Sequence, residues 1–154
     1  IHEIDYLYWL FGNISETTSY TQKNSDLKIP VEDIAEILFL FKNNIIGHIH
    51  LDYFQKPQSR TCKIIGTEGV LISNLGKNSV KIYDHKTRKW KEKIINKKYN
   101  KNKMYSDELN HFIRCIQNNL KDYNNIKQST NVLKIALSVK KSAQIKKSVK
   151  INEL

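Results

Sequence analysis

The sequence predicts an α+β domain in which helices pack on one face of an open-faced, largely antiparallel β-sheet. The hydrophobic patterns run in the order of one helix, a series of strands and then two helices. The strands come in pairs separated by short turn segments, which is typical of antiparallel hairpins. The two central strands carry apolar side chains on both faces, so each face of the sheet requires a cover.

Residues 2–11 predict a helix, because apolar residues recur there with the spacing of one helix face. This stripe consists of Ile4, Leu7, Tyr8 and Phe11. A different face carries His2, Asp5, Tyr6 and Trp9 at the same spacing. Gly12 is the expected end of the helix, because glycine readily forms a C-terminal cap. Thr17–Gln22 then predicts a strand from its threonine and tyrosine content, and residues 23–32 predict a loop.

Asp33–Lys42 and Ile45–Phe54 predict two long strands, and Asn43-Asn44 between them predicts a two-residue turn. This turn places Phe41 opposite Ile46, and opposed residues share a face of the sheet. One face then carries Ile34, Glu36, Leu38, Leu40, Ile49, Leu51 and Tyr53. The other carries Ile37, Phe39, Phe41, Ile46, His48, His50 and Asp52. Helices of the same domain can cover one face, and the other needs a second sheet, another domain or a partner subunit.

The rest of the chain predicts two more hairpins, two helices and a closing strand. The strands are Arg60–Ile65 and Val70–Leu75, then Val80–Asp84 and Lys89–Ile95, with Val149–Ile151 closing the sheet. Ser106 is the predicted cap of a helix with the stripe Leu109, Phe112, Ile113 and Ile116. Ser129 or Thr130 is the predicted cap of the last helix, whose stripe is Val132, Ile135, Ala136, Val139 and Ala143.

Composition narrows the class of protein. The chain has 154 residues and a formal net charge of +11, and no apolar run approaches the length of a membrane helix. A basic chain can bind nucleic acid, but only Arg60, Arg88 and Arg114 are arginines, and the alternating lysines of 89–93 are typical of an exposed edge strand. Cys62 and Cys115 form no disulfide framework, which favours a reduced, cytoplasmic protein.

Motifs for cofactor and metal binding are missing from the sequence. It contains neither G-x-G-x-x-G after a strand nor a phosphate-binding loop, and its one close glycine pair, Gly66 and Gly69, lies in a predicted turn. We therefore expect this chain alone to bind no dinucleotide. The His48-to-Asp52 segment puts three possible ligands on one strand face, but without a further ligand cluster we predict no metal site.

The ordered set of motifs resembles the C-terminal domain of the glucose–fructose oxidoreductase / inositol dehydrogenase / MocA family. The matching stretches are His2–Gly12, Glu32–Ile37, Gly47–Tyr53, Arg60–Gly69, Met104–Leu109 with His111-Phe112, and Val132–Leu137 with Lys141–Ala143. The chain lacks an initiator Met and a signal peptide and begins inside a helical pattern, so we expect residues 1–154 to be one domain of a longer enzyme.

The resemblance implies a parent enzyme whose missing Rossmann domain binds NAD or NADP and which transfers hydride at a sugar, sugar-nucleotide or cyclitol carbon. His2 matches the family's active-site histidine, and Asp5, Tyr53, Gln55 and Arg60 are the expected substrate-binding residues. The sheet face is expected to form a homo-oligomer. Two alternatives remain: a non-catalytic oligomerisation domain and a basic nucleic-acid-binding module.

Overall fold

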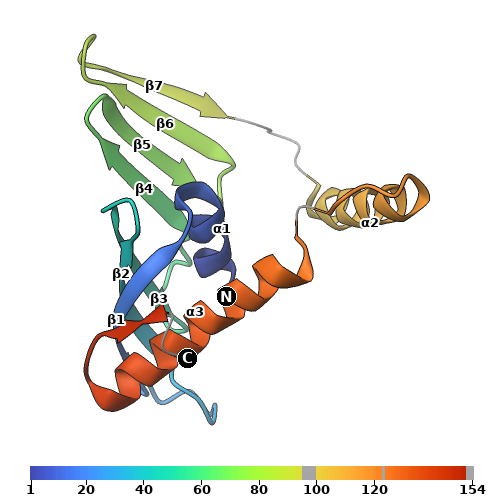
Figure 1. Ribbon diagram of the computed structural model, residues 1–154. Helices are drawn as coiled ribbons and strands as arrows, with labels where there is room; N and C mark the ends of the chain where they lie inside the picture. Colours follow the sequence, from blue (N-terminus) through green and yellow to red (C-terminus); the bar gives the residue numbers. More distant parts are fainter. Residues whose placement is uncertain (95–99, 123, 152–154) are drawn as a thin grey trace. The chain divides into compact units, whose positions relative to one another are not determined.

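The computed structural model describes residues 1–94, 100–122 and 124–151. The chain divides into two units, residues 1–54 with 122–154 and residues 55–121 (Figure 1). Each unit contains one four-stranded antiparallel sheet. The α+β class and the antiparallel pairing are thus confirmed, and the strands are divided between two sheets.

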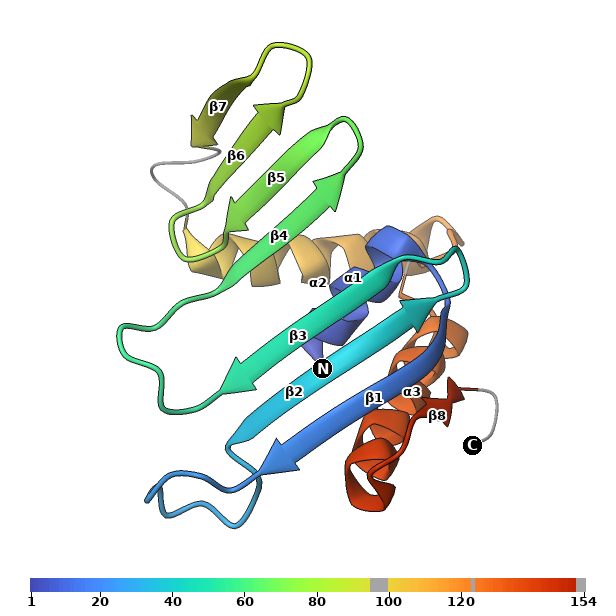
Figure 2. The same cartoon turned by 90° about the vertical axis from the view of Figure 1, so that its left-hand side faces the viewer.

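The sheet of the first unit has the strand order β3-β2-β1-β8 (Figure 2). Its strands are β1 (Ile14–Gln22), β2 (Ile34–Phe41), β3 (Ile46–Asp52) and β8 (Val149–Lys150). β1 begins three residues before the predicted Thr17, and Ile14 places a buried side chain in the core. β8 pairs with β1 and forms the predicted closing strand at the edge of this sheet.

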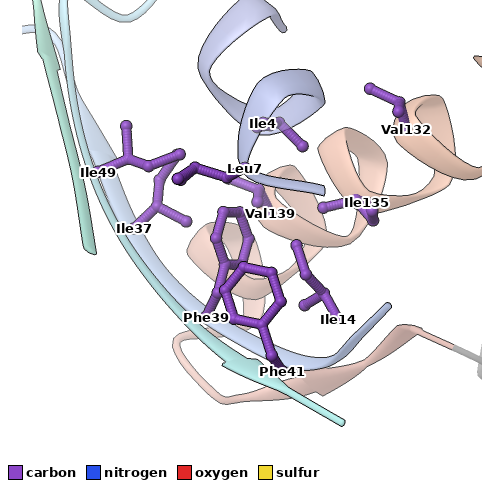
Figure 3. Packing of buried hydrophobic residues seen from close by; sticks show 10 residues of the cluster. All are labelled: Ile4, Leu7, Ile14, Ile37, Phe39, Phe41, Ile49, Val132, Ile135 and Val139. Carbon is purple, nitrogen blue, oxygen red and sulfur yellow. The ribbon is translucent and has the colours of Figure 1, made fainter. Parts of the chain in front are cut away.

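Two helices, α1 (His2–Phe11) and α3 (Ile126–Ile145), pack on the same face of this sheet. Their apolar stripes and the inner face of the sheet form one core, drawn in Figure 3. Its members are Ile4, Leu7, Ile14, Ile37, Phe39, Phe41, Ile49, Val132, Ile135 and Val139. Two buried hydrogen bonds fix α3 on β1: the Ser19 amide donates to Ser142 Oγ at 3.0 Å, and Ser19 Oγ donates to the Val139 carbonyl at 2.6 Å.

The turn between β2 and β3 contains three residues, so the predicted two-residue turn and its register are wrong. The Phe41 amide donates to the Ile45 carbonyl at 2.9 Å, and Asn44 adopts a left-handed conformation with φ of 65°. The third turn residue shifts β3 by one position and exchanges its faces. Glu36 therefore lies opposite His50, whereas the predicted register placed these two side chains on different faces.

The second unit contains β4 (Thr61–Gly66), β5 (Gly69–Asn74), β6 (Ser79–Asp84) and β7 (Lys89–Ile94) in sequential order. The predicted hairpins are confirmed within one or two residues, although residue 95 lies outside the described residues. Position 69 requires glycine for a steric reason, because a Cβ there would lie 2.1 Å from the Tyr83 carbonyl oxygen. As predicted, β7 is an edge strand.

Both late helices begin earlier than predicted, because asparagine rather than serine or threonine caps them. The Asn100 side chain accepts a hydrogen bond from the Asn102 amide at the start of α2 (Lys101–Gln117). The Asn125 side chain does the same for the Gln128 amide at the start of α3. Ser106 lies inside α2, where its hydroxyl donates to the Asn102 carbonyl at 3.2 Å. The predicted stripe of α2 is present but remains largely exposed in this chain.

Candidate functional site

The exposed side of α1 carries the predicted catalytic histidine. His2 is the first residue of the helix and is exposed, whereas Ile4 and Leu7 anchor the opposite side in the core. Asp5 is half-buried and lies less than one turn from His2 along the helix. Within the described residues the side chain of His2 has no hydrogen bond or ion pair, so its imidazole is available to a ligand. Gly12 ends the helix as predicted, with φ of 83°.

The other predicted site residues lie after β3. Tyr53 is 70% exposed, and its amide donates to the Asp33 carbonyl at 3.0 Å, which fixes its backbone at the end of the hairpin. Gln55 and Arg60 belong to the second unit. The Arg60 carbonyl accepts from the Leu75 amide at 3.0 Å, so this residue directly precedes the paired part of β4. The structure therefore places His2, Asp5 and Tyr53 in one unit, and Gln55 and Arg60 in the other.

A buried carboxylate holds the loop that precedes this hairpin. Asp33 accepts hydrogen bonds from the Asn24 amide at 2.7 Å, the Ser25 amide at 2.9 Å and Lys23 Nζ at 3.0 Å. Burial by itself disfavours the charged form of Asp33. These hydrogen bonds, together with one from the Ser25 hydroxyl, outweigh burial and hold the pKa of Asp33 well below its usual range. Asp33 is thus a structural anchor at the base of the β2–β3 hairpin.

The open face of the first sheet carries a polar cluster that the predicted register concealed. We call Glu36, His48, His50 and Asp52 the open-face cluster. Glu36 Oε2 lies 2.9 Å from His48 Nε2, and Glu36 Oε1 lies 2.5 Å from His50 Nδ1. Asp52 Oδ2 lies 3.0 Å from His50 Nε2. A three-residue turn ending in asparagine was the sequence signal for this register, because asparagine tolerates the left-handed conformation.

The open-face cluster favours a protonated His50. Both ring nitrogens of His50 lie against carboxylate oxygens, and only the imidazolium can donate from both. The hydrogen bond to Glu36 raises the pKa of His50, with partial burial opposing and Asp52 adding to the rise. The same hydrogen bond lowers the pKa of Glu36, against the opposing effect of burial. The charge of this cluster, whose side chains come from β2 and β3, therefore depends on the protonation of His50.

Apolar side chains flank the open-face cluster on the same face. Leu38 is 50% exposed, Leu40 41%, Ile46 76% and Tyr20 61%. The prediction that both faces of the hairpin are apolar is confirmed. However, Ile37, Phe39 and Phe41 lie in the core, and the four side chains named above are among the exposed apolar residues of the chain.

The basic edge strand β7 has the features of a solvated strand. Trp90 lies against Tyr83 of β6, with ring centroids 5.3 Å apart. Lysines near it are paired: Lys81 with Glu92 at 3.5 Å, and Lys86 with Glu68 at 3.6 Å. Part of the basic run, residues 95–99, lies outside the described residues. Where it is described, this region favours an exposed sheet edge over a base-stacking surface.

The family of the chain follows from a match over almost its whole length. The family model described as "Oxidoreductase family, C-terminal alpha/beta domain" matches residues 1–151. The chain belongs to this family, the one of glucose–fructose oxidoreductase, inositol dehydrogenase and MocA. A search of curated proteins gave no match. Among the described residues, no helix is both long enough and apolar enough to cross a bilayer.

Solved structures share this fold at low sequence identity. A levoglucosan dehydrogenase in complex with NADH has a TM-score of 0.87 and 16% identity, over 97% of this chain and 48% of the other. An oxidoreductase from Agrobacterium radiobacter, in complex with NAD⁺, L-tartaric acid and magnesium, has a TM-score of 0.83 and 15% identity, over 98% and 47%. An oxidoreductase domain protein from Kribbella flavida has a TM-score of 0.84 and 14% identity, over 97% and 48%. The chain thus spans about half the length of these structures.

Proposed function

We propose that this chain is the substrate-binding and self-association domain of an NAD(P)-dependent oxidoreductase that acts on a CH–OH carbon of a sugar, sugar nucleotide or cyclitol. The observation that carries the proposal is the family match over residues 1–151. Similar structures in complex with NADH and levoglucosan, or with NAD⁺, support the cofactor and substrate classes. The parent protein is proposed to work in the cytoplasm, and two unpaired cysteines agree with a reducing compartment.

NAD or NADP is assigned to the other half of the parent enzyme. The sequence has no glycine-rich turn between a strand and a helix, and Gly66 and Gly69 belong to the β4–β5 turn. Calorimetric titration of the chain with NADH and with NADPH should therefore show no saturable heat. Micromolar affinity for either nucleotide would contradict this division of roles.

His2 is proposed to transfer the proton that accompanies hydride transfer. Oxidation of an alcohol carbon removes a hydride from carbon and a proton from oxygen, and the nicotinamide accepts only the hydride. A histidine has an ordinary pKa of ~6.5, which suits this exchange at neutral pH. Its place at the start of α1, with Ile4 and Leu7 anchored in the core, gives the exposed imidazole a fixed base.

The proposed substrate contacts come from four further residues. Asp5, on the same helix as His2, can orient the imidazole or accept a hydrogen bond from a substrate hydroxyl. Tyr53, Gln55 and Arg60 follow β3 and offer a phenol, an amide and a guanidinium, which suit the hydroxyls of a sugar. Each of these groups is proposed to affect substrate affinity more than cofactor affinity.

The test is steady-state kinetics of the full-length enzyme, with NAD or NADP and a panel of sugars and cyclitols that includes levoglucosan. His2→Ala should lower kcat by about 10²–10⁴-fold and leave the cofactor Kd nearly unchanged. His85→Ala is the matched control, because His85 is an exposed histidine in the β6–β7 turn to which no role is assigned. A His2→Ala enzyme with kcat within about twofold of the parent would contradict the proton-transfer role. A parent without any dehydrogenase activity would favour the non-catalytic oligomerisation domain.

Self-association through the open face is the second proposed role, with a second copy of the chain as partner. Leu38, Leu40, Ile46 and Tyr20 form an apolar surface around a cluster that contains both signs of charge. Monomeric proteins seldom leave such a surface uncovered, and a twofold-related copy can bury it. Sedimentation that shows a stable monomer at high concentration would contradict this role.

A further inference from the structure

We propose that a pocket between α1, the β2–β3 turn and α3 binds a small organic oxyanion. The pocket has a volume of about 260 Å³ and lies entirely within the first unit. Its polar lining residues are Tyr8, Asn13, Lys42, Asn131 and Lys134. None of these residues belongs to the substrate site proposed above, so the inference does not depend on that function.

A chain of hydrogen bonds orders the polar wall of the pocket. Asn131 Nδ2 donates to the Tyr8 hydroxyl at 3.1 Å, and this hydroxyl donates to Asn13 Oδ1 at 3.2 Å. The single proton of Tyr8 is therefore committed to Asn13. Since Asn13 accepts through its oxygen, its NH₂ group remains for another acceptor, as does the second N–H of Asn131. The wall thus offers donors rather than acceptors to a ligand.

Two lysines among the lining residues add positive charge that no described carboxylate neutralises. The eight lining residues include no Asp or Glu, and neither Lys42 nor Lys134 forms an ion pair with any described residue. Lys140 lies on α3, as Lys134 does, and it pairs with Glu32 Oε1 at 3.1 Å. A lysine of this helix is thus paired where a carboxylate lies within reach. Two cations beside a donor-rich wall match the chemistry of a carboxylate or a phosphate group.

Two further hydrogen bonds hold the walls of the pocket together. The Lys42 amide donates to the Asn13 carbonyl at 2.9 Å, and Asn43 Nδ2 donates to the Phe11 carbonyl at 3.2 Å. These bonds attach the β2–β3 turn to the loop after α1. Because Asn43 satisfies a carbonyl at the C-terminal end of α1, that end is less repulsive to an anion than an uncapped one. The pocket is therefore largely preformed.

The remaining lining residues indicate the body of the ligand. Ile14 and Ile135 are core residues, and Ile151 is half-buried beside them. A lining that combines isoleucines with lysines fits an anionic head with a short apolar body better than a bare inorganic ion. A short-chain carboxylate and a small phosphate ester share this chemistry, and their different head groups can be separated by titration.

The experiment is an NMR titration of the chain at pH 7 and constant ionic strength, with butyrate and with inorganic phosphate as separate probes. The side-chain amide signals of Asn13 and Asn131 should shift and saturate with at least one probe. Lys42→Gln and Lys134→Gln should each raise the Kd by about tenfold, the expected loss for one charge-assisted hydrogen bond. Lys141→Gln, on the same helix and outside the lining, removes the same charge and should leave the Kd within about twofold.

The outcomes separate a specific site from general attraction to a basic protein. Saturation by butyrate identifies carboxylates as the ligands, and saturation by phosphate alone identifies phosphoryl groups. Equal weakening by Lys141→Gln and Lys134→Gln would overturn the proposal, because the charge of +11 would then explain the binding. Linear shifts without saturation for both probes would also overturn it. If a lysine variant loses the dispersed amide spectrum of the folded chain, Asn131→Asp provides a second test and should abolish saturation by placing a carboxylate in the wall.

Discussion

Replacing Ile46 with lysine should separate self-association from folding. Ile46 is the most exposed large apolar side chain of the open face, at 76%, and it lies next to the β2–β3 turn opposite Leu40. A lysine there loses little in the monomer, because surface substitutions usually change the free energy of unfolding by no more than about 0.5 kcal/mol. In the proposed assembly, the same substitution removes apolar burial and introduces a charge that must lose its hydration.

The magnitude follows from the exposed fraction. Full burial of an isoleucine side chain contributes about 1.5–3 kcal/mol, so covering the 76% that is exposed contributes about 1–2 kcal/mol per copy. A twofold interface loses this contribution from both copies, about 2–4 kcal/mol in all. The dimer Kd of Ile46→Lys should therefore rise by about 30- to 700-fold.

The assay is sedimentation equilibrium over a range of protein concentrations, with urea denaturation of the same samples. Ile65→Lys is the matched control, because Ile65 is 71% exposed on β4 of the other sheet. It makes the same chemical change in a strand, so it measures any cost that lysine imposes on strand formation. An unchanged Kd for Ile46→Lys, or an equal rise for Ile65→Lys, would refute an interface on the open face.

Three further substitutions test the electrostatics and packing of the first unit. Glu36→Gln should lower the pKa of His50 in an NMR titration of its imidazole, because the strongest contribution to its raised pKa is removed; an unchanged titration would show that Glu36 does not contact His50 in solution. The Glu36–His50 pair should stabilise the fold by about 0.2–1 kcal/mol, since both side chains are more than a third exposed. The stabilisation requires a charged Glu36 and a protonated His50. It is therefore present above the unfolded pKa of Glu36, and it is lost as pH rises through the folded pKa of His50. The difference in melting temperature between the parent and Glu36→Gln should thus be largest near pH 5–6, which is about midway between the ordinary pKa values of the two groups. Asp33→Asn should lower the melting temperature at pH 7, and because the folded pKa of Asp33 is depressed the difference should persist at pH 4 and shrink only in stronger acid; equal melting temperatures at pH 7 would contradict its anchoring role. Phe39→Ala should cost about 3–5 kcal/mol in urea denaturation, since Phe39 is 1% exposed, and a loss below about 1 kcal/mol would place it outside the core.

Elements whose pattern depends on local chemistry were predictable from the sequence. The stripe of α1 follows the helical period, and its glycine stop coincides with a residue that has a positive φ. The hairpins of the second unit follow from glycine and polar turn segments. The starts of α2 and α3 were placed too late because Asn100 and Asn125 cap as well as serine does and lie outside the apolar pattern. The division into two sheets depends on long-range pairing, which periodicity does not encode.

The open-face cluster shows how one turn residue decides which chemistry a sheet presents. In the observed register the polar side chains of β3 share the face of Glu36, and its apolar Ile49 and Leu51 share the face of Ile37, so the hydrophobic pattern agrees with the three-residue turn. The left-handed Asn44 allows the longer turn, and with it the partner of Glu36 changes from the predicted apolar side chain to His50. The same register turns Ile49 inward, against Ile37, and so contributes to the core on which α1 rests. The core under α1 on one side of the sheet and the raised pKa of His50 on the other therefore both depend on the register that this turn sets.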